Sequence, residues 1–196
     1  MSRFVLSLLV TTLLAASAAA QVETWQLDPP HCAAQFAVRH MGISTIRGTF
    51  TKLSGMVQYD PTAPAKSSVD VTIDAASLDS RVEMRDNDLR SPRLLDVEKY
   101  PTITFKSKRV EPAGAGKLKV TGDLTIHGVT KEAVLDVDGP SEPIKDPRGN
   151  SRMGASAITT INRRDFGITT YPAAMVADDV AITIDVEMSK PAPAKN

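Results

Sequence analysis

The sequence lacks the features of a disulfide-bonded, nucleic-acid-binding or membrane-spanning protein. Cys32 is its only cysteine, so no disulfide can form within the chain. Its 23 Lys and Arg residues balance its 23 Asp and Glu residues, and without a basic surplus no nucleic-acid partner is expected. After residue 14, no apolar run approaches the roughly 20 residues that a membrane-spanning helix needs. We expect Cys32 to be a small buried residue, with an intermolecular bridge or a reactive thiol as the alternative.

The first twenty residues have the pattern of a cleavable export signal. Arg3 supplies a positive charge, residues 4–14 form an apolar run, and small residues follow up to Ala20. This run is too short for a membrane-spanning helix. We therefore expect a signal peptide at residues 1–20, a periplasmic domain at residues 21–188 and, because of its prolines and lysines, a disordered tail at residues 189–196.

The rest of the chain alternates apolar and polar residues, and Gly, Pro and Asp turns interrupt the pattern about every ten residues. This alternation predicts an all-β domain of eight or nine antiparallel strands. We place them at residues 32–40, 46–50, 53–59, 68–73, 102–108, 117–126, 132–137, 153–161 and 180–188. Residues 77–100 break the pattern and favour two short helices, the first capped by Asp79 or Ser80 and the second by Ser91.

Eight or so strands leave no exposed edge if they close into a barrel. A barrel of this size can hold one slender ligand. A β-sandwich core would show the same alternation, so the pattern leaves barrel and sandwich open. If the barrel forms, we expect one face of each strand to line a channel, and a register error of one residue would exchange the faces. The channel residues predicted in this way are Phe36, Val38, His40, Phe50, Val71, Ile73, Phe105, Leu124, Ile182 and Ile184.

Several ordered motifs run through nearly the whole of residues 25–188. The most distinctive are Leu95-Asp96-Val97-x-x-Tyr100-Pro101-x-Ile103-x-Phe105 and Gly122-Asp123-Leu124-Thr125-Ile126-His127-Gly128; others are Gly48-x-Phe50 and Asn162-Arg163-x-Asp165-Phe166-Gly167. These motifs resemble those of the YceI family of exported bacterial proteins. The resemblance implies a lipocalin-like antiparallel barrel with a long apolar channel. It further implies non-covalent binding of a polyisoprenoid or similar long-chain lipid, for transport or storage, often by a homodimer.

Two positions depart from the family pattern. Cys32 stands where serine is common, and Leu94 or Leu95 stands where an aromatic residue is common. Both changes would alter the width or the polarity of the channel without changing the fold.

Arginines in residues 77–100 are candidates for binding a lipid head group, because a guanidinium group matches phosphate and carbonyl oxygens. We single out Arg85 and Arg90. The alternative is a solvated helix face on which Arg85 pairs with Asp86 or Asp88.

Other chemistry has less support in the sequence. His31, His40 and His127 invite a metal site, but no CxxC or HxxxH cluster accompanies them. The chain contains no GxSxG or HExxH motif and no phosphate-binding glycine loop. We therefore expect no catalytic residue, metal or cofactor. An exported scaffold or stress-response module without a lipid ligand remains the alternative, ahead of a metal-binding protein or a hydrolase.

Overall fold

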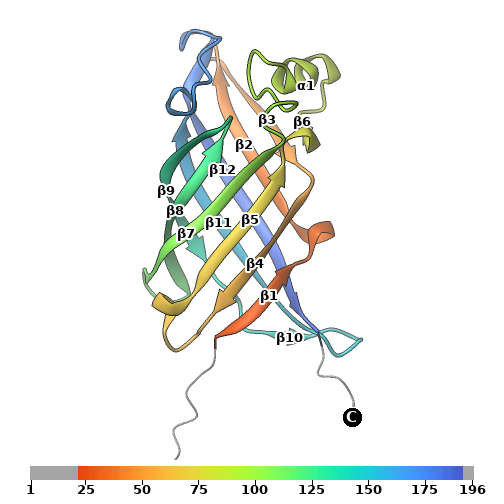
Figure 1. The fold of residues 1–196 in the computed structure, drawn as a ribbon, viewed down its shortest axis with the longest axis vertical. Helices are drawn as coiled ribbons and strands as arrows, with labels where there is room; N and C mark the ends of the chain where they lie inside the picture. The colour runs from red at the N-terminus through yellow and green to blue at the C-terminus, as the bar shows by residue number, and fades with distance from the viewer. Residues whose placement is uncertain (1–21, 192–196) are drawn as a thin grey trace, which may run out of the picture.

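The alternation of apolar and polar side chains produces β-strands, and these strands surround a common interior to form a barrel. One α-helix lies at the upper end of the barrel in Figure 1. This computed structural model describes residues 22–191. Its strands are β1 (Glu23–Leu27), β2 (Ala33–His40), β3 (Ser44–Phe50), β4 (Leu53–Tyr59), β5 (Ser68–Asp74), β6 (Leu78–Asp79), β7 (Thr102–Pro112), β8 (Lys117–Ile126), β9 (Val129–Asp138), β10 (Ile144–Lys145), β11 (Ser151–Asn162) and β12 (Val176–Lys190). The helices are α1 (Glu83–Arg90) and the short 3-10 helices η1 (Pro29–His31), η2 (Pro64–Lys66), η3 (Ala75–Ser77) and η4 (Arg163–Phe166).

Eight strand positions form the barrel wall, because three pairs of short strands continue one another. β1 and β2 both pair with β12, so they lie end to end along it. On the next position of the wall, β4 pairs with β1 and β3 pairs with β2. On the position after that, β5 pairs with β4 and β6 pairs with β3. Pairing of β11 with β12, from Ser151↔Lys190 to Asn162↔Asp179, joins the ends of the sheet. The predicted eight-stranded antiparallel barrel is confirmed, and the sandwich is excluded.

The lower end of the barrel is filled by large side chains. Trp25, Met153 and Met188 are each at most 3% exposed and pack in one cluster. The chain between β9 and β11, which contains β10, crosses this end in Figure 1. Phe105 and Val110 belong to a second cluster on the wall formed by β7, β8, β9 and β11. The interior is therefore densely packed at the end opposite α1.

Helix α1 begins later than the sequence predicts. It starts at Glu83, not just after Asp79 or Ser80, because both of these residues are used in the preceding turn. The Asp79 carboxylate accepts the backbone N–H of Arg81 at 2.7 Å. The backbone N–H of Ser80 donates to the Asp86 carboxylate at 2.9 Å. The buried contact between Ser80 and Asp86 therefore anchors the helix to the preceding turn, and neither Asp79 nor Ser80 caps its first turn.

Other boundaries also differ from the expectations. The second helix predicted after Ser91 is a series of turns. β1 is a strand that the alternation did not predict, since it is only five residues long and ends before two prolines. β12 extends to Lys190, two residues into the expected tail, because Ser189 pairs with Gln26 of β1. The expected signal peptide at 1–20 and the tail residues 192–196 lie outside the described residues. Between residues 22 and 191, no helix has the length and apolar character needed to cross a bilayer.

Candidate functional site

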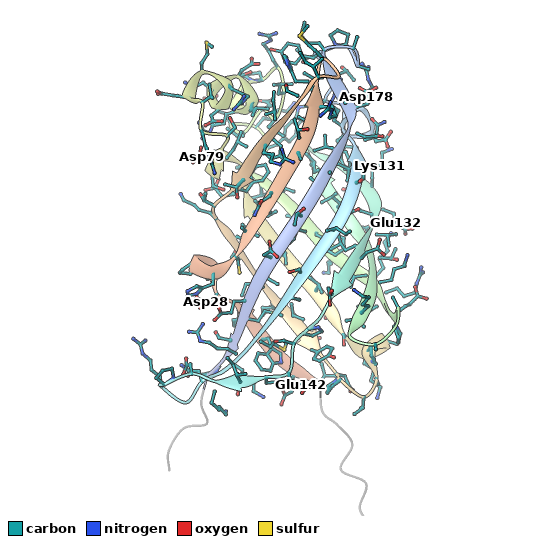
Figure 2. The ribbon with its side chains drawn as sticks, turned by 180° about the vertical axis from the view of Figure 1, so that it is seen from behind. Asp28, Asp79, Lys131, Glu132, Glu142 and Asp178 are labelled. Atoms are coloured by element: carbon teal, nitrogen blue, oxygen red, sulfur yellow. The ribbon has the colours of Figure 1, made fainter. Side chains whose placement is uncertain are left out.

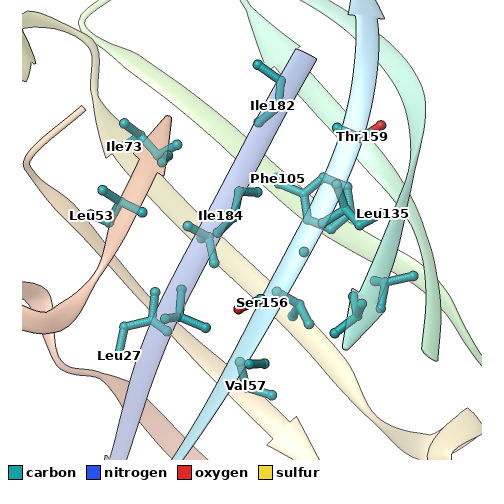
Figure 3. A pocket seen from close by; sticks show the side chains of 18 of the residues that line it. Leu27, Leu53, Val57, Ile73, Phe105, Leu135, Ser156, Thr159, Ile182 and Ile184 are labelled. Carbon is teal, nitrogen blue, oxygen red and sulfur yellow. The ribbon is translucent and has the colours of Figure 1, made fainter. Parts of the chain in front are cut away.

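Two adjoining cavities occupy the barrel interior. The deep cavity, of about 190 Å³, lies in the middle of the barrel, where Figure 3 shows side chains from β1, β4, β5, β7, β9, β11 and β12 converging. The outer cavity, of about 610 Å³, lies between the upper strands and α1. Five residues line both cavities and mark the junction between them: Phe50, Ile103, Ile126, Ile161 and Ile182. We call the two together the channel.

All ten residues predicted to line a channel border these cavities. Val71, Ile73, Phe105, Leu124 and Ile184 line the deep cavity, Phe36, Val38 and His40 line the outer cavity, and Phe50 and Ile182 line both. The predicted strand register therefore places the expected face inward. Contact of these residues with a ligand stays a prediction.

The Phe36 ring fits against the barrel wall because the inward position opposite it carries no side chain. Gly48 on β3 lies opposite Phe36 on β2. A Cβ atom at Gly48 would be 2.4 Å from Cζ of Phe36, so the Phe36 ring occupies the volume that any other side chain would need. The Phe36 ring also lies 6.0 Å from the ring of Phe50, centroid to centroid. The Gly48-x-Phe50 motif thus holds the Phe36 ring back against the wall.

Charged side chains border only the outer part of the channel. None of the described residues that line the deep cavity carries a charge. The outer cavity is lined by Arg85, Asp88, Arg93 and Arg163, together with His40 and Tyr171. It reaches solvent at α1, since Met84 lines it and is nevertheless 81% exposed. The channel therefore offers an apolar depth and a polar mouth.

The two arginines proposed for head-group binding have different environments. Arg85 lines the outer cavity and donates from Nε to Oγ of Ser80 at 2.7 Å. Arg90 does not line either cavity. It donates to the backbone carbonyls of Ala76 and Leu78 and so fixes α1 to η3 and to the start of β6. Only Arg85 is placed where it can meet a ligand.

A polar bridge that sequence reasoning missed spans the mouth. The hydroxyl of Tyr171 donates to the Asp88 carboxylate of α1 at 2.6 Å, and this bond raises the pKa of Tyr171. The Arg93 guanidinium lies 5.6 Å from the centre of the Tyr171 ring and 3.5 Å from the Asp88 carboxylate. The bridge joins α1 to the chain between η4 and β12, and no sequence motif brings these residues together.

Arg163, from the Asn162-Arg163 motif, organises the loop on the other side of the mouth. Its buried guanidinium donates to four backbone carbonyls, those of Ile168, Tyr171, Val176 and Ala177. It also pairs with Asp178, which Figure 2 labels at the upper end of the barrel. Burial lowers the pKa of Arg163. Its hydrogen bonds show that it shapes the loop after η4.

One group of possible metal ligands occurs among the described residues, at the lower end of the barrel. Ligand atoms of Asp28, His31 and Glu187 lie within 4.8 Å of one another. Arg152 already supplies a cation to this group: its Nη1 is 2.5 Å from Asp28 and also contacts Glu187. Its Nε is 3.1 Å from Asp146. A metal ion would have to displace this guanidinium, so the cluster is an ion-pair network.

The remaining histidine and the cysteine have structural contacts. His127 lies at a left-handed position after β8, with Nδ1 3.2 Å from the carbonyl of Phe166, and its ring meets the edge of Tyr100. A Cβ atom at Gly128 would clash with the same Tyr100 ring, so the two most distinctive motifs pack on each other. Cys32 is buried, its Sγ is 3.5 Å from the carbonyl of Glu187, and burial raises its pKa.

Comparison with protein families and curated relatives gives consistent matches. The model of the YceI-like domain matches residues 25–188. A UPF0312 protein of Vibrio cholerae serotype O1 is 42% identical over 150 residues, which cover 76% of this chain and 78% of the relative. A UPF0312 protein of Pseudomonas putida strain W619 is 37% identical over 177 residues, which cover 89% of this chain and 91% of the relative.

Solved structures share the barrel. BcnA of Burkholderia cenocepacia superposes with a TM-score of 0.73 at 27% identity, covering 82% of this chain and 98% of BcnA. The YCEI protein of Campylobacter jejuni superposes with a TM-score of 0.70 at 31% identity, covering 94% of this chain and 99% of that protein. A domain of Saccharophagus degradans, described as polyisoprenoid-binding, gives a TM-score of 0.63 at 17% identity, covering 85% of this chain and 98% of that domain. At that identity the last match shows a common fold.

Proposed function

Because the chain belongs to the YceI-like domain family, we propose that it binds one long-chain lipid of the polyisoprenoid class in its channel, without catalysis, for transport or storage. The observation that carries this proposal is an unfilled interior that is apolar throughout its depth and charged only at its mouth. The polyisoprenoid-binding description of the similarly folded Saccharophagus degradans domain supports the choice of lipid.

Burial of hydrocarbon does not by itself decide whether a lipid prefers the channel to a membrane. Removing hydrocarbon from water is worth about 0.8 kcal/mol per CH₂, or about 4 kcal/mol for one five-carbon isoprene unit. Such a lipid normally resides in a bilayer, where its chain is already away from water. Net preference for the channel therefore depends on shape and on contacts with the head group. The outer cavity, of about 610 Å³, has the size of an ordinary ligand pocket.

We propose that the polar head of the lipid lies at the mouth, beside Arg85 and Arg93. Both guanidinium groups line the outer cavity, and Tyr171, on the loop after η4, lines it as well. Phosphate or carbonyl oxygens would suit these donors. We also propose that binding takes place in the periplasm, because residues 1–20 have the pattern of an export signal.

The proposal is tested on protein that has been purified under native conditions from its own host. An organic extract of this protein is analysed by mass spectrometry. The wild type should carry a stoichiometric long-chain lipid. Ile182→Trp should abolish it, because Ile182 lies at the junction of the two cavities. The matched control is Thr183→Trp, since the neighbouring residue on β12 is exposed and points away from the channel.

The outcomes separate binding from misfolding. Both tryptophan variants should show wild-type circular dichroism, and only Ile182→Trp should lose the lipid. A wild-type protein without lipid, which also fails to take up an added polyprenyl phosphate, would favour the scaffold alternative. Equal lipid content in both variants would place the ligand outside the channel.

A further inference from the structure

Large apolar side chains are exposed around the mouth of the channel. Ile43 is 79% and Met84 is 81% exposed, and Met41, Val82 and Met175 are exposed as well. They come from three separate segments: the β2–β3 turn, the start of α1 and the chain before β12. Figure 1 places all three segments at the upper end of the barrel. We call these five residues the apolar rim; such clusters commonly mark binding surfaces.

The conformation of Met41 is a second sign that the rim is used. Met41 has a φ of 51°, in the left-handed region where Gly, Asn and Asp are favoured. Its backbone N–H donates to the carbonyl of Met175 at 2.8 Å, which ties the turn to the chain before β12. An asparagine would fit this turn with less strain and expose less apolar area. Strained positions of this kind are concentrated at functional sites.

The rim continues the channel lining to the surface. Met84 and Met175 belong to the rim and also line the outer cavity. Charges beside the rim are of both signs: Arg93 pairs with Asp88, Arg164 pairs with Asp178, and Arg81 and Glu83 flank Val82 in the chain. Charge therefore selects no acidic or basic partner. A partner that buries the rim must be apolar itself and must leave the mouth open to a hydrocarbon chain.

A lipid bilayer meets both conditions, and we propose that the apolar rim docks onto a bilayer surface. This inference rests on the proposed function and adds the partner. With the rim inserted at the boundary between the head groups and the acyl chains, a lipid chain passes between the membrane and the channel without crossing water. Flexible methionines suit a surface that must adapt to disordered lipid. The two ends of the described chain lie at the lower end of the barrel, away from the rim.

Vesicle flotation tests the docking. The probe is phosphatidylcholine vesicles that contain no isoprenoid, so that the result does not depend on a ligand. The full-length mature protein should float with the vesicles. Replacing two rim residues, Ile43→Asp with Met84→Asp, should lower the bound fraction by about tenfold or more, because charged side chains do not enter the apolar layer.

The matched control carries the same two changes elsewhere. Ile144 is 67% and Met56 is 48% exposed, and neither belongs to the rim. Ile144→Asp with Met56→Asp should float like the wild type. The proposal is overturned if the wild type does not float, or if both double variants lose binding equally. It is also overturned if the rim variant only abolishes self-association in sedimentation, since the rim would then cover a second copy.

A fluorescent dye attached to a rim residue tests the docking independently of flotation. In Cys32→Ala protein, Met84→Cys carrying an environment-sensitive dye should shift its emission to the blue on vesicles, and Ile144→Cys should not. The extract experiment on the same proteins separates the two proposals. Lipid in the channel with no vesicle binding would overturn the docking alone, and vesicle binding with an empty channel would overturn the proposed function alone.

Discussion

At the scale of single residues, Gly48 determines how wide the channel is. The Phe36 ring lies where a Cβ of residue 48 would be, so Gly48→Ala should push that ring toward the outer cavity. We expect a loss of stability of about 1–3 kcal/mol, as for other overpacked sites. Uptake of a fluorescent polyprenyl lipid should fall more than the stability alone explains. Urea unfolding and lipid titration measure the two effects.

Gly154→Ala is the matched control for this prediction. A Cβ at Gly154 would meet its nearest neighbour, the carbonyl of Val186, at an ordinary 3.4 Å. That variant should bind lipid like the wild type. If Gly48→Ala binds lipid equally well, Phe36 does not control the width of the channel.

The inward position of residues was predictable from the sequence, and their hydrogen bonds were not. Alternation fixes which face a side chain occupies, so Val71 and Ile184 could be placed inside once the barrel was assumed. Arg163 and Arg90 were different, because the carbonyls they bind include Ile168 in the loop after η4 and Ala76 in η3, and the path of these short segments has no periodic signal. The Asn162-Arg163 motif was the one signal in the sequence that pointed to Arg163.

At the scale of secondary-structure elements, α1 is held over the mouth by its contact with the loop after η4. Tyr171→Phe removes the hydroxyl that donates to Asp88. Since a hydrogen bond to a charged group contributes about 1.5–3 kcal/mol, less where solvent reaches it, we expect the lipid to leave about threefold to tenfold faster. Stopped-flow release of a fluorescent lipid measures this rate.

A double-mutant cycle checks that the effect arises from this one bond. Asp88→Ala should also speed release, and the double variant should be no faster than the faster single variant. Rate increases that multiply in the double variant, and so add in activation free energy, would show that Tyr171 and Asp88 act separately.

Long elements were easier to predict than short ones. β8 and β12 alternate over ten or more residues, so their existence was clear from the sequence. β1 has five residues, and α1 has eight and begins after a turn stabilised by its own side chains. Ser91 followed by proline looks like a helix start, yet the backbone N–H groups of Leu94 and Asp96 both bond to the Ser91 carbonyl in a turn. Tertiary contacts decided these short segments.

At the scale of the whole molecule, Arg152 joins three distant parts of the chain through Asp28, Asp146 and Glu187. Hydrogen bonds from Asn150 and from Arg152 lower the pKa of Asp146 to about 2. The usual value in an unfolded chain is about 3.9. The stability that ionised Asp146 provides is therefore complete above about pH 5 and is lost as the pH falls through 4 toward 2.

This linkage predicts a measurable pH dependence. The free energy of unfolding should decrease between about pH 5 and pH 2.5, and Asp146→Asn should make that decrease smaller. Asn keeps an acceptor for the backbone N–H groups of Arg148 and Asn150 but carries no charge for Arg152. Because the pKa of Asp28 is also lowered, the Asp146→Asn variant should still lose some stability as the pH falls. Urea unfolding at several pH values gives the profile, and identical profiles for both proteins would contradict the assignment.

The decreasing size of the interior from mouth to floor also constrains how the proposed lipid would enter and leave. The outer cavity has about 610 Å³ and the deep cavity about 190 Å³, and Trp25, Met153 and Met188 fill the barrel below. If the protein carries a lipid as proposed, the chain enters tail first at α1 and leaves head first there. Such a carrier would detach from the donor and turn the same face toward the acceptor, so each journey would deliver a single molecule.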